Sequence, residues 1–415
     1  MKRGLWLLYA LFVLYGGTIP FHFNGDLASV GERLSGLPLN PLVSPDTGHR
    51  LSIPDVVQNV LLYLPFGVLG VLAGMNPRRA RRIVFVTAAG TAVSILVETL
   101  QLLTSDRVSS LGDVLANSTG AFIGAAAAVQ VARFGEAGLG RLKAEGLGDT
   151  ATLRPFAVAA LLAAIAMWQP FDVTLETGTV VSKVRGLERD WWQFTGWRDE
   201  GLLILVWAFF TMTLASYLSA LGESREGRKA AAIGIGVAAM LEATQILIGS
   251  RMPGLWDVAI SAAGACAGAA MWSGATRVVW PALWLGAIIG ATAAAAAMLS
   301  LSPFEISPSY HTFGWFPMLG YYSRTTFETL SHVCELMIVF VPLGFWLGQR
   351  PATRARITLL ATGLVFAIAA PIEALQGWIV GRYPDVSDIA VGVMGAVIGV
   401  MAARPAATPY NGRAL

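Results

Sequence analysis

Three copies of one polar pattern hold most of the side chains in this chain that could do chemistry. Counting from a Glu, each copy places Gln at +3, Arg at +9, Asp at +15, and Gly at +22 and +26. Two carboxylates, a carboxamide and a guanidinium at fixed spacing could bind an anionic group, accept a proton or pair with one another. The copies are Glu98, Gln101, Arg107, Asp113, Gly120 and Gly124; Glu242, Gln245, Arg251, Asp257, Gly264 and Gly268; and Glu373, Gln376, Arg382, Asp388, Gly395 and Gly399.

The spacing within the first copy predicts that its polar groups converge at one end of a helical hairpin. Glu98 and Gln101 are three residues apart and share one helix face. Asp113 and Asn117 are four apart and share a face of the next helix, with Arg107 in the turn between them. The arrangement therefore places five polar groups near one boundary of an apolar layer.

Two interpretations of this convergence remain open. In the structural one, Arg107 pairs with Glu98 or Asp113 and fastens the hairpin, Asp113 caps the following helix, and the glycines form a close-packing face. In the functional one, the groups form a polar cleft in which Arg107 binds an anionic headgroup such as a phosphate. Glu98 would then orient Arg107 or accept a proton.

The elements that position these groups are apolar segments long enough to span a bilayer. The chain has 415 residues, of which 55% are hydrophobic and only 13% are charged, whereas a soluble domain has about 25% charged residues. This composition predicts an all-α polytopic integral membrane protein with about 12 transmembrane helices. The expected spans are 4–20, 54–74, 83–103, 111–132, 155–170, 201–219, 230–249, 255–273, 281–301, 330–348, 357–380 and 386–403.

Basic residues in the short loops predict the orientation of these spans. Arg and Lys gather in every second loop, for example Arg78, Arg79, Arg81 and Arg82 after the second span. The positive-inside rule then puts both termini in the cytoplasm and all three motif copies on the outer face. The first span follows Lys2 and Arg3 but no small-residue cleavage site follows it, so we expect it to be a retained helix.

The motif spacing also predicts internal repeats. We expect three parallel four-helix repeats at 1–150, 151–278 and 279–415, with the motif on the third and fourth helices of each. The second repeat is degenerate, because it lacks the Pro-x-Gly that the first and third carry at Pro65 and Pro342.

The first copy resembles the VanZ-like family of bacterial membrane proteins. The resemblance rests on Asn59 with Pro65-Phe66-Gly67, on Glu98-x-x-Gln101, and on Arg107, Asp113, Asn117 and Gly120-x-x-x-Gly124. It implies a multi-pass protein of the bacterial inner (cytoplasmic) membrane, built here from three fused copies of a unit that usually stands alone. The family is named for a protein associated with low-level resistance to the glycopeptide teicoplanin, so it also implies a role in the cell envelope and antibiotic resistance.

These observations leave several functions open. The first is binding of an envelope lipid or glycan precursor at the outer face, with effects on envelope assembly or glycopeptide sensitivity. The others are a transporter or lipid flippase, a membrane enzyme using Glu98 or Asp113 as a general base on a lipid-linked substrate, and a scaffold without a ligand. We expect Asn59, Glu98, Gln101, Arg107, Asp113 and Asn117 to bind substrate, with the other copies as equivalents. Asn59 and Asn117 have counterparts in neither other copy, which favours the first repeat.

The expected partners are a membrane lipid and a lipid-linked glycan or glycolipid, with no nucleic acid, no cofactor and no metal. His332 and Glu335 share a helix face and could ligate a metal, but a self-satisfied polar cluster is the favoured interpretation. Aromatic residues at 191–197 and 310–322 fit either an interfacial belt or a stacking platform for sugar rings. The two cysteines, Cys266 and Cys334, lie in apolar runs and are expected to be buried.

Overall fold

The structure is a computed structural model in which most of the chain is described. It describes residues 2–19, 21–23, 27–35, 40–41, 43, 53–74, 79–104, 108–144, 150–169, 174, 176–190, 197–275, 281–322, 326–350 and 352–403. Arg107 and the aromatic residues at 191–196 lie outside these ranges.

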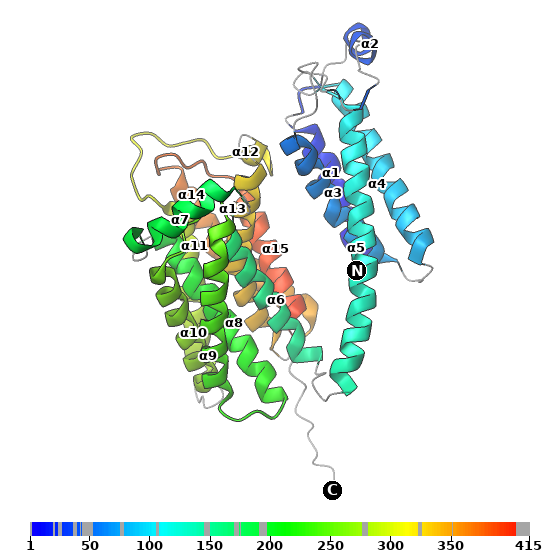
Figure 1. Ribbon diagram of the computed structural model, residues 1–415. Helices are drawn as coiled ribbons and strands as arrows, with labels where there is room; N and C mark the ends of the chain where they lie inside the picture. Colours follow the sequence, from blue (N-terminus) through cyan, green and yellow to red (C-terminus); the bar gives the residue numbers. More distant parts are fainter. Residues whose placement is uncertain are drawn as a thin grey trace. The chain divides into compact units, whose positions relative to one another are not determined.

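Each of the twelve expected spans coincides with a helix. The helices are α1 (Lys2–Thr18), α3 (Ile53–Ala73), α4 (Arg79–Leu102), α5 (Leu111–Ala144), α6 (Thr150–Trp168), α8 (Trp197–Ala220), α9 (Glu226–Thr244), α10 (Leu255–Ala275), α11 (Pro281–Leu301), α13 (Thr326–Gly348), α14 (Arg354–Gln376) and α15 (Val386–Ala402) (Figure 1). Short helices stand between them: α2 (Leu27–Ser35), α7 (Thr177–Asp190), the 3-10 turn η1 (Gln245–Leu247) and α12 (Leu319–Tyr322).

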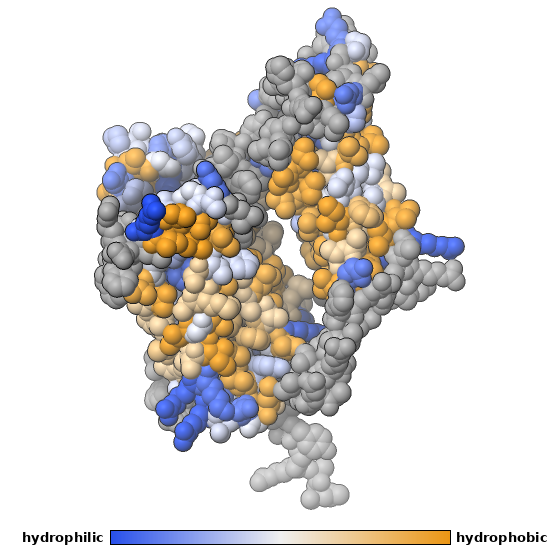
Figure 2. Space-filling view, in the orientation of Figure 1, coloured by the Kyte–Doolittle hydropathy of each residue, from blue (hydrophilic) through white to orange (hydrophobic). Residues whose placement is uncertain are grey.

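The chain is an all-α polytopic integral membrane protein, as its composition predicts. Within the described residues, eight helices are long and apolar enough to cross a membrane, namely α3, α4, α5, α8, α9, α10, α13 and α14. Shorter apolar stretches lie in α6, α11 and α15. Figure 2 shows hydrophobic residues along the flanks of the helices, with most hydrophilic residues toward helix ends. Twelve crossings remain a prediction.

The chain divides into two compact units, Met1–Arg141 and Leu142–Leu415. In the N-terminal unit, α1, α3, α4 and α5 pack around a core that includes Val13, Tyr63 and Phe66. In the C-terminal unit, the other long helices pack around a larger core that includes Trp207 and Phe340. The first motif copy lies in the N-terminal unit, and the second and third lie in the C-terminal unit.

The motif glycines pack the fourth helix of each copy directly against the second, as the small-residue spacing predicts. A Cβ atom at Gly124 would collide with the Leu64 carbonyl oxygen on α3. A Cβ at Gly268 would collide with the Ala208 carbonyl oxygen on α8, and one at Gly399 with that of Val341 on α13. The same backbone contact therefore recurs in all three copies and fixes the register of one helix against the other.

Two features of the helices differ from expectation. Helix α5 continues to Ala144, twelve residues beyond the expected end, through a segment that contains no Pro but has three Gly among its twelve residues. Helices α2 and α7 form in segments expected to be loops, and both place charged and apolar residues on different faces.

Candidate functional site

The Glu of each copy binds the backbone at the start of the following helix. The carboxylate of Glu98 accepts the Ser110 N–H at 2.8 Å, that of Glu242 accepts the Gly254 N–H at 2.9 Å, and that of Glu373 accepts the Asp385 N–H at 2.9 Å. All three donors lie at +12, directly before the first residue of α5, α10 and α15. The Glu side chain therefore fastens the turn between the two helices of the hairpin.

This contact corrects the expectation that the Asp at +15 caps the helix. Ser110 occupies the cap position of α5, where its hydroxyl accepts the N–H groups of Gly112 and Asp113. Asp385 is the N-cap of α15 and accepts the Ser387 N–H at 2.6 Å. Helix α5 begins at Leu111, where its span was expected to begin, so Asp113 is its third residue and the cap lies at Ser110. An acid at that position still interacts favourably with the helix dipole.

The motif Gln differs between the copies. Gln101 donates its amide to the Gly17 carbonyl at the end of α1, at 2.9 Å. Gln245 and Gln376 instead donate to the carboxylates of Glu242 and Glu373 in their own copies, at 3.0 and 3.2 Å.

The motif Arg of the second and third copies binds the end of an earlier helix. The Nε of Arg251 donates to the Gln169 carbonyl at 2.8 Å, just beyond α6. The Nε of Arg382 donates to the Ser302 carbonyl at 2.8 Å, just beyond α11. A cation is favourable at a helix C-terminus. These contacts hold the first helix of each copy to the motif turn.

In the first and second copies, a cationic side chain from a short helix binds the turn that follows the motif Gln. Arg33 on α2 donates to the Thr104 carbonyl, and Lys183 on α7 donates to the Ile248 carbonyl. Both carbonyls lie at +6 of the motif, and both cations lie thirteen residues after a Pro-Phe pair. Helices α2 and α7 therefore occupy equivalent places, which the charge pattern after each Pro-Phe pair could have indicated.

The third copy surrounds its Asp with partners that sequence reasoning did not assign. Asp388 accepts the Tyr321 hydroxyl at 2.5 Å and lies 2.9 Å from Nε2 of His332. The Nδ1 of His332 lies 3.9 Å from Glu335. All four residues are at most 8% exposed. Among the described residues no group of three could hold a metal ion, and the contacts here are those of a polar cluster.

The second and third copies meet at a small cavity within the C-terminal unit. Its volume is about 20 Å³ and its lining includes Gln169, Asp199, Arg251 and Glu335. A water molecule needs only about 10–15 Å³ of such space and two or more polar partners. This cavity can therefore hold one water between the two copies.

The first copy contains a buried polar network between α3, α4 and α5. Asn59 donates its amide to Asp113 at 2.7 Å, and one turn deeper Asn117 donates to the Ser94 hydroxyl at 2.9 Å. The carbonyl oxygen of Asn117 lacks a hydrogen-bond partner among the described residues. The Tyr63 hydroxyl also lacks a hydrogen-bond partner of good geometry among the described residues, although Ser94 lies near enough to interact with it. Tyr63, Ser94 and Asn117 are at most 4% exposed.

The helix register shows what the other copies hold at these positions. The second copy has Leu203, Trp207, Ala238 and Ser261, and the third has Leu336, Phe340, Ala369 and Gly392. All four positions are thus polar in the first copy and apolar in the third. In the second copy, the Trp207 indole and the Ser261 hydroxyl are buried and also lack partners among the described residues. Sequence reasoning found Asn59 and Asn117 but missed Tyr63 and Ser94, although Ser94 lies one helical turn before Glu98.

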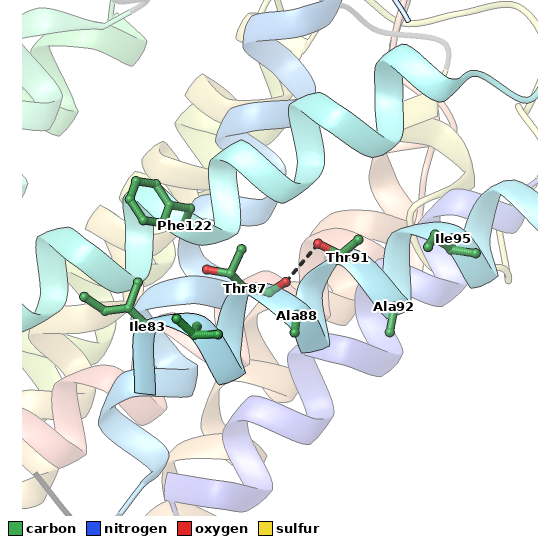
Figure 3. Close-up of a pocket in the computed structure, with 8 residues that line it drawn as sticks. Ile83, Thr87, Ala88, Thr91, Ala92, Ile95 and Phe122 are labelled. Carbon is green, nitrogen blue, oxygen red and sulfur yellow. Dashed lines mark hydrogen bonds between the residues drawn. The ribbon is translucent and has the colours of Figure 1, made fainter. Parts of the chain in front are cut away.

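Further hydroxyls continue this network along α4 and α5. Thr91 donates to the Ser118 hydroxyl at 2.8 Å and to the Thr87 carbonyl at 3.0 Å. Thr87 and Thr91 also line a shallow groove of about 530 Å³ on α4, which Phe122 of α5 borders (Figure 3). Polar groups therefore extend about 16 Å along α4 from Glu98 to Thr87, at 1.5 Å per residue.

Comparison with known families agrees with this geometry. The VanZ/LLP1 family model matches residues 6–133 and again residues 282–407, together more than half of the chain. The chain belongs to the VanZ/LLP1 family. The two matched ranges contain the first and third motif copies, so this VanZ-like protein holds at least two fused copies of the family unit. No curated protein and no solved structure matches the chain at a significant level.

Proposed function

We propose that this VanZ-like protein binds the anionic headgroup of an envelope lipid or lipid-linked glycan precursor at the motif end of its N-terminal unit. Binding there would affect envelope assembly or sensitivity to a teicoplanin-type glycopeptide, which is the cellular role that the family resemblance suggests. The motif end would face outward across the bacterial inner membrane, with both termini cytoplasmic.

The observation that carries this proposal is the polar interior of the first copy. Burying a polar group without a partner in a membrane protein is costly, so such groups usually serve a ligand or one another. Asn117 and Tyr63 offer an acceptor and a hydroxyl that the described residues leave unsatisfied. One turn nearer the motif end, Asn59 donates a hydrogen bond to Asp113.

The motif residues contribute to the proposed site in two ways. Glu98 shapes it by holding Ser110, a contact that the other copies share. Arg107 would supply the positive charge for a phosphate, because a guanidinium recognises phosphate through paired hydrogen bonds. In the other two copies, Arg251 and Arg382 bind helix-end carbonyls.

The test measures binding of a polyprenyl phosphate to the purified full-length protein in lipid nanodiscs. The double variant Asn59→Leu/Asn117→Gly, which installs the residues of the third copy, should weaken binding about tenfold or more, since a hydrogen bond to a charged group contributes about 1.5–3 kcal/mol. Arg107→Ala should do the same. Ser261→Ala, a change at the position of Asn117 in the second copy, is the matched control and should leave binding unchanged.

Two results would contradict the proposal. One is unchanged binding by a correctly folded Asn59→Leu/Asn117→Gly variant. The other is equal binding of the uncharged polyprenol, which would show that the headgroup is not recognised.

We also infer that residues 151–278 form a third, diverged family unit, giving repeats at 1–150, 151–278 and 279–415. Three contacts support this. Glu242 holds the +12 N–H, Arg251 binds the carbonyl before Pro170, and Gly268 packs on Ala208, as their counterparts do in the third copy.

A further inference from the structure

A deep apolar slot opens between four helices of the C-terminal unit. Its volume is about 450 Å³, and its lining residues come from α8, α10, α11 and α13. The Thr292 hydroxyl and the Trp346 indole are the polar side-chain groups among them. On the α11 side the lining includes Ala287, Ala291 and Ala294, all of which are exposed. The slot is therefore a recess that opens toward the surroundings of the protein.

The environment of the slot determines which molecules can occupy it. Helices α8, α10 and α13 are long and apolar enough to span a membrane, so the slot faces hydrocarbon. Water would find few polar partners there, and an ordered water needs two to four. Lipid chains are the apolar molecules available at this depth.

The length of the slot matches one leaflet. Its lining extends from Gly201 to Met212 on α8 and from Ala287 to Met298 on α11. Eleven residues of helix rise about 16 Å, and half of a hydrocarbon core of about 30 Å is about 15 Å. Gly201 and Met298 lie near the motif end of their helices. The slot thus begins near the motif end of α8 and α11, and on α13 its lining reaches Trp346, two residues before that helix ends.

We propose that this slot binds one fatty acyl chain of a phospholipid from the leaflet on the motif side. A chain of that kind spans one leaflet and fills the slot, whereas a long polyprenyl chain exceeds its length. Because the chain comes from hydrocarbon and not from water, the binding free energy comes from close van der Waals packing against α8 and α11, at about 0.1–0.2 kcal/mol per pair of carbon atoms in contact. This site lies in the C-terminal unit and is independent of the headgroup site proposed for the N-terminal unit.

The test reconstitutes the full-length protein in vesicles of phosphatidylethanolamine and phosphatidylglycerol with a trace of phospholipid bearing a photoreactive diazirine on one acyl chain. After illumination, mass spectrometry of the peptides should find labels on the slot residues of α8 and α11. Ala291→Trp fills the slot and should lower this labelling about tenfold, the effect of losing on the order of ten carbon–carbon contacts of about 0.1–0.2 kcal/mol each. Ala294→Phe also fills the slot and replaces Ala291→Trp in the test if the Ala291→Trp variant does not fold.

Ala239→Trp is the matched control, since Ala239 is exposed on α9, away from the slot. It should leave slot labelling unchanged. Equal labelling of the exposed face of α9 and of the slot would overturn the proposal, as would labelling that a folded Ala291→Trp variant retains. Two other results would also contradict the proposal. Preferential labelling of the slot by a diazirine-bearing polyprenyl phosphate would show that a polyprenyl chain occupies it. A photo-induced link through α11 to a second copy of the chain would show that another protein molecule covers it.

Discussion

At the scale of single residues, the motif side chains shared by all copies build the fold, whereas other side chains on the same helices differ between the copies. Glu98, Glu242 and Glu373 each accept the N–H at the start of the next helix. This shared contact explains why a carboxylate recurs three times in a chain with few charges. Function is therefore better sought at the positions where the copies differ, which are those of Asn59, Tyr63, Ser94 and Asn117.

The role of the Glu predicts a specific loss of stability. Glu242→Ala leaves the Gly254 N–H without its acceptor and should lower the free energy of unfolding by about 1–3 kcal/mol. Glu242→Gln keeps an acceptor oxygen and should lower the free energy of unfolding by a smaller amount. Unfolding in mixed micelles, followed by circular dichroism, measures both changes.

Glu223→Ala is the control for that series. Glu223 pairs with Lys229 at the surface, where both side chains are nearly half exposed. Such a pair contributes about 0–1 kcal/mol. If Glu242→Ala lowered the free energy of unfolding no more than Glu223→Ala does, the contact between Glu242 and Gly254 would not be a determinant of the fold.

At the scale of helices, hydrophobic length was enough to predict the elements, but not their ends. The apolar runs indicate all twelve helices. Helix α5, for example, continues twelve residues beyond the expected end of its span. The contacts at the termini also reach across the sequence, as when Glu373 binds Asp385 from twelve residues away. The Tyr321 contact with Asp388 spans sixty-seven residues and leaves no local pattern. The polar interior of the first copy became visible only when the register between α3 and α5 was known.

The helix contact at the motif glycines predicts opposite effects of one substitution at two sites. Gly268→Ala forces a Cβ into the Ala208 carbonyl oxygen, and such overpacking costs about 1–3 kcal/mol. Gly236→Ala on α9 meets no atom within 4 Å and should stabilise the helix by up to about 1 kcal/mol. Unfolding free energies of the two variants should therefore differ in sign, and a loss of equal size at both sites would refute close packing at Gly268.

At the scale of the whole molecule, the two units have separate cores. One hydrophobic cluster draws its members from residues 13–129 and the other from residues 159–403. Each unit also has its own motif contacts, with Glu98 in the first and Glu242 and Glu373 in the second. The headgroup site and the acyl slot proposed above are thus built from different cores.

Separate cores predict separate responses to mutation. Glu98→Ala should speed amide hydrogen exchange in α3, α4 and α5 by about 5–30-fold, the effect of 1–2 kcal/mol, and leave α8, α10 and α15 unchanged. Glu242→Ala should do the reverse, and a polyprenyl phosphate should protect only the N-terminal unit. Hydrogen exchange measured by mass spectrometry in nanodiscs distinguishes the units directly. If Glu98→Ala loosened both units together, the cores would be coupled, and a ligand bound in one unit could then act through the other.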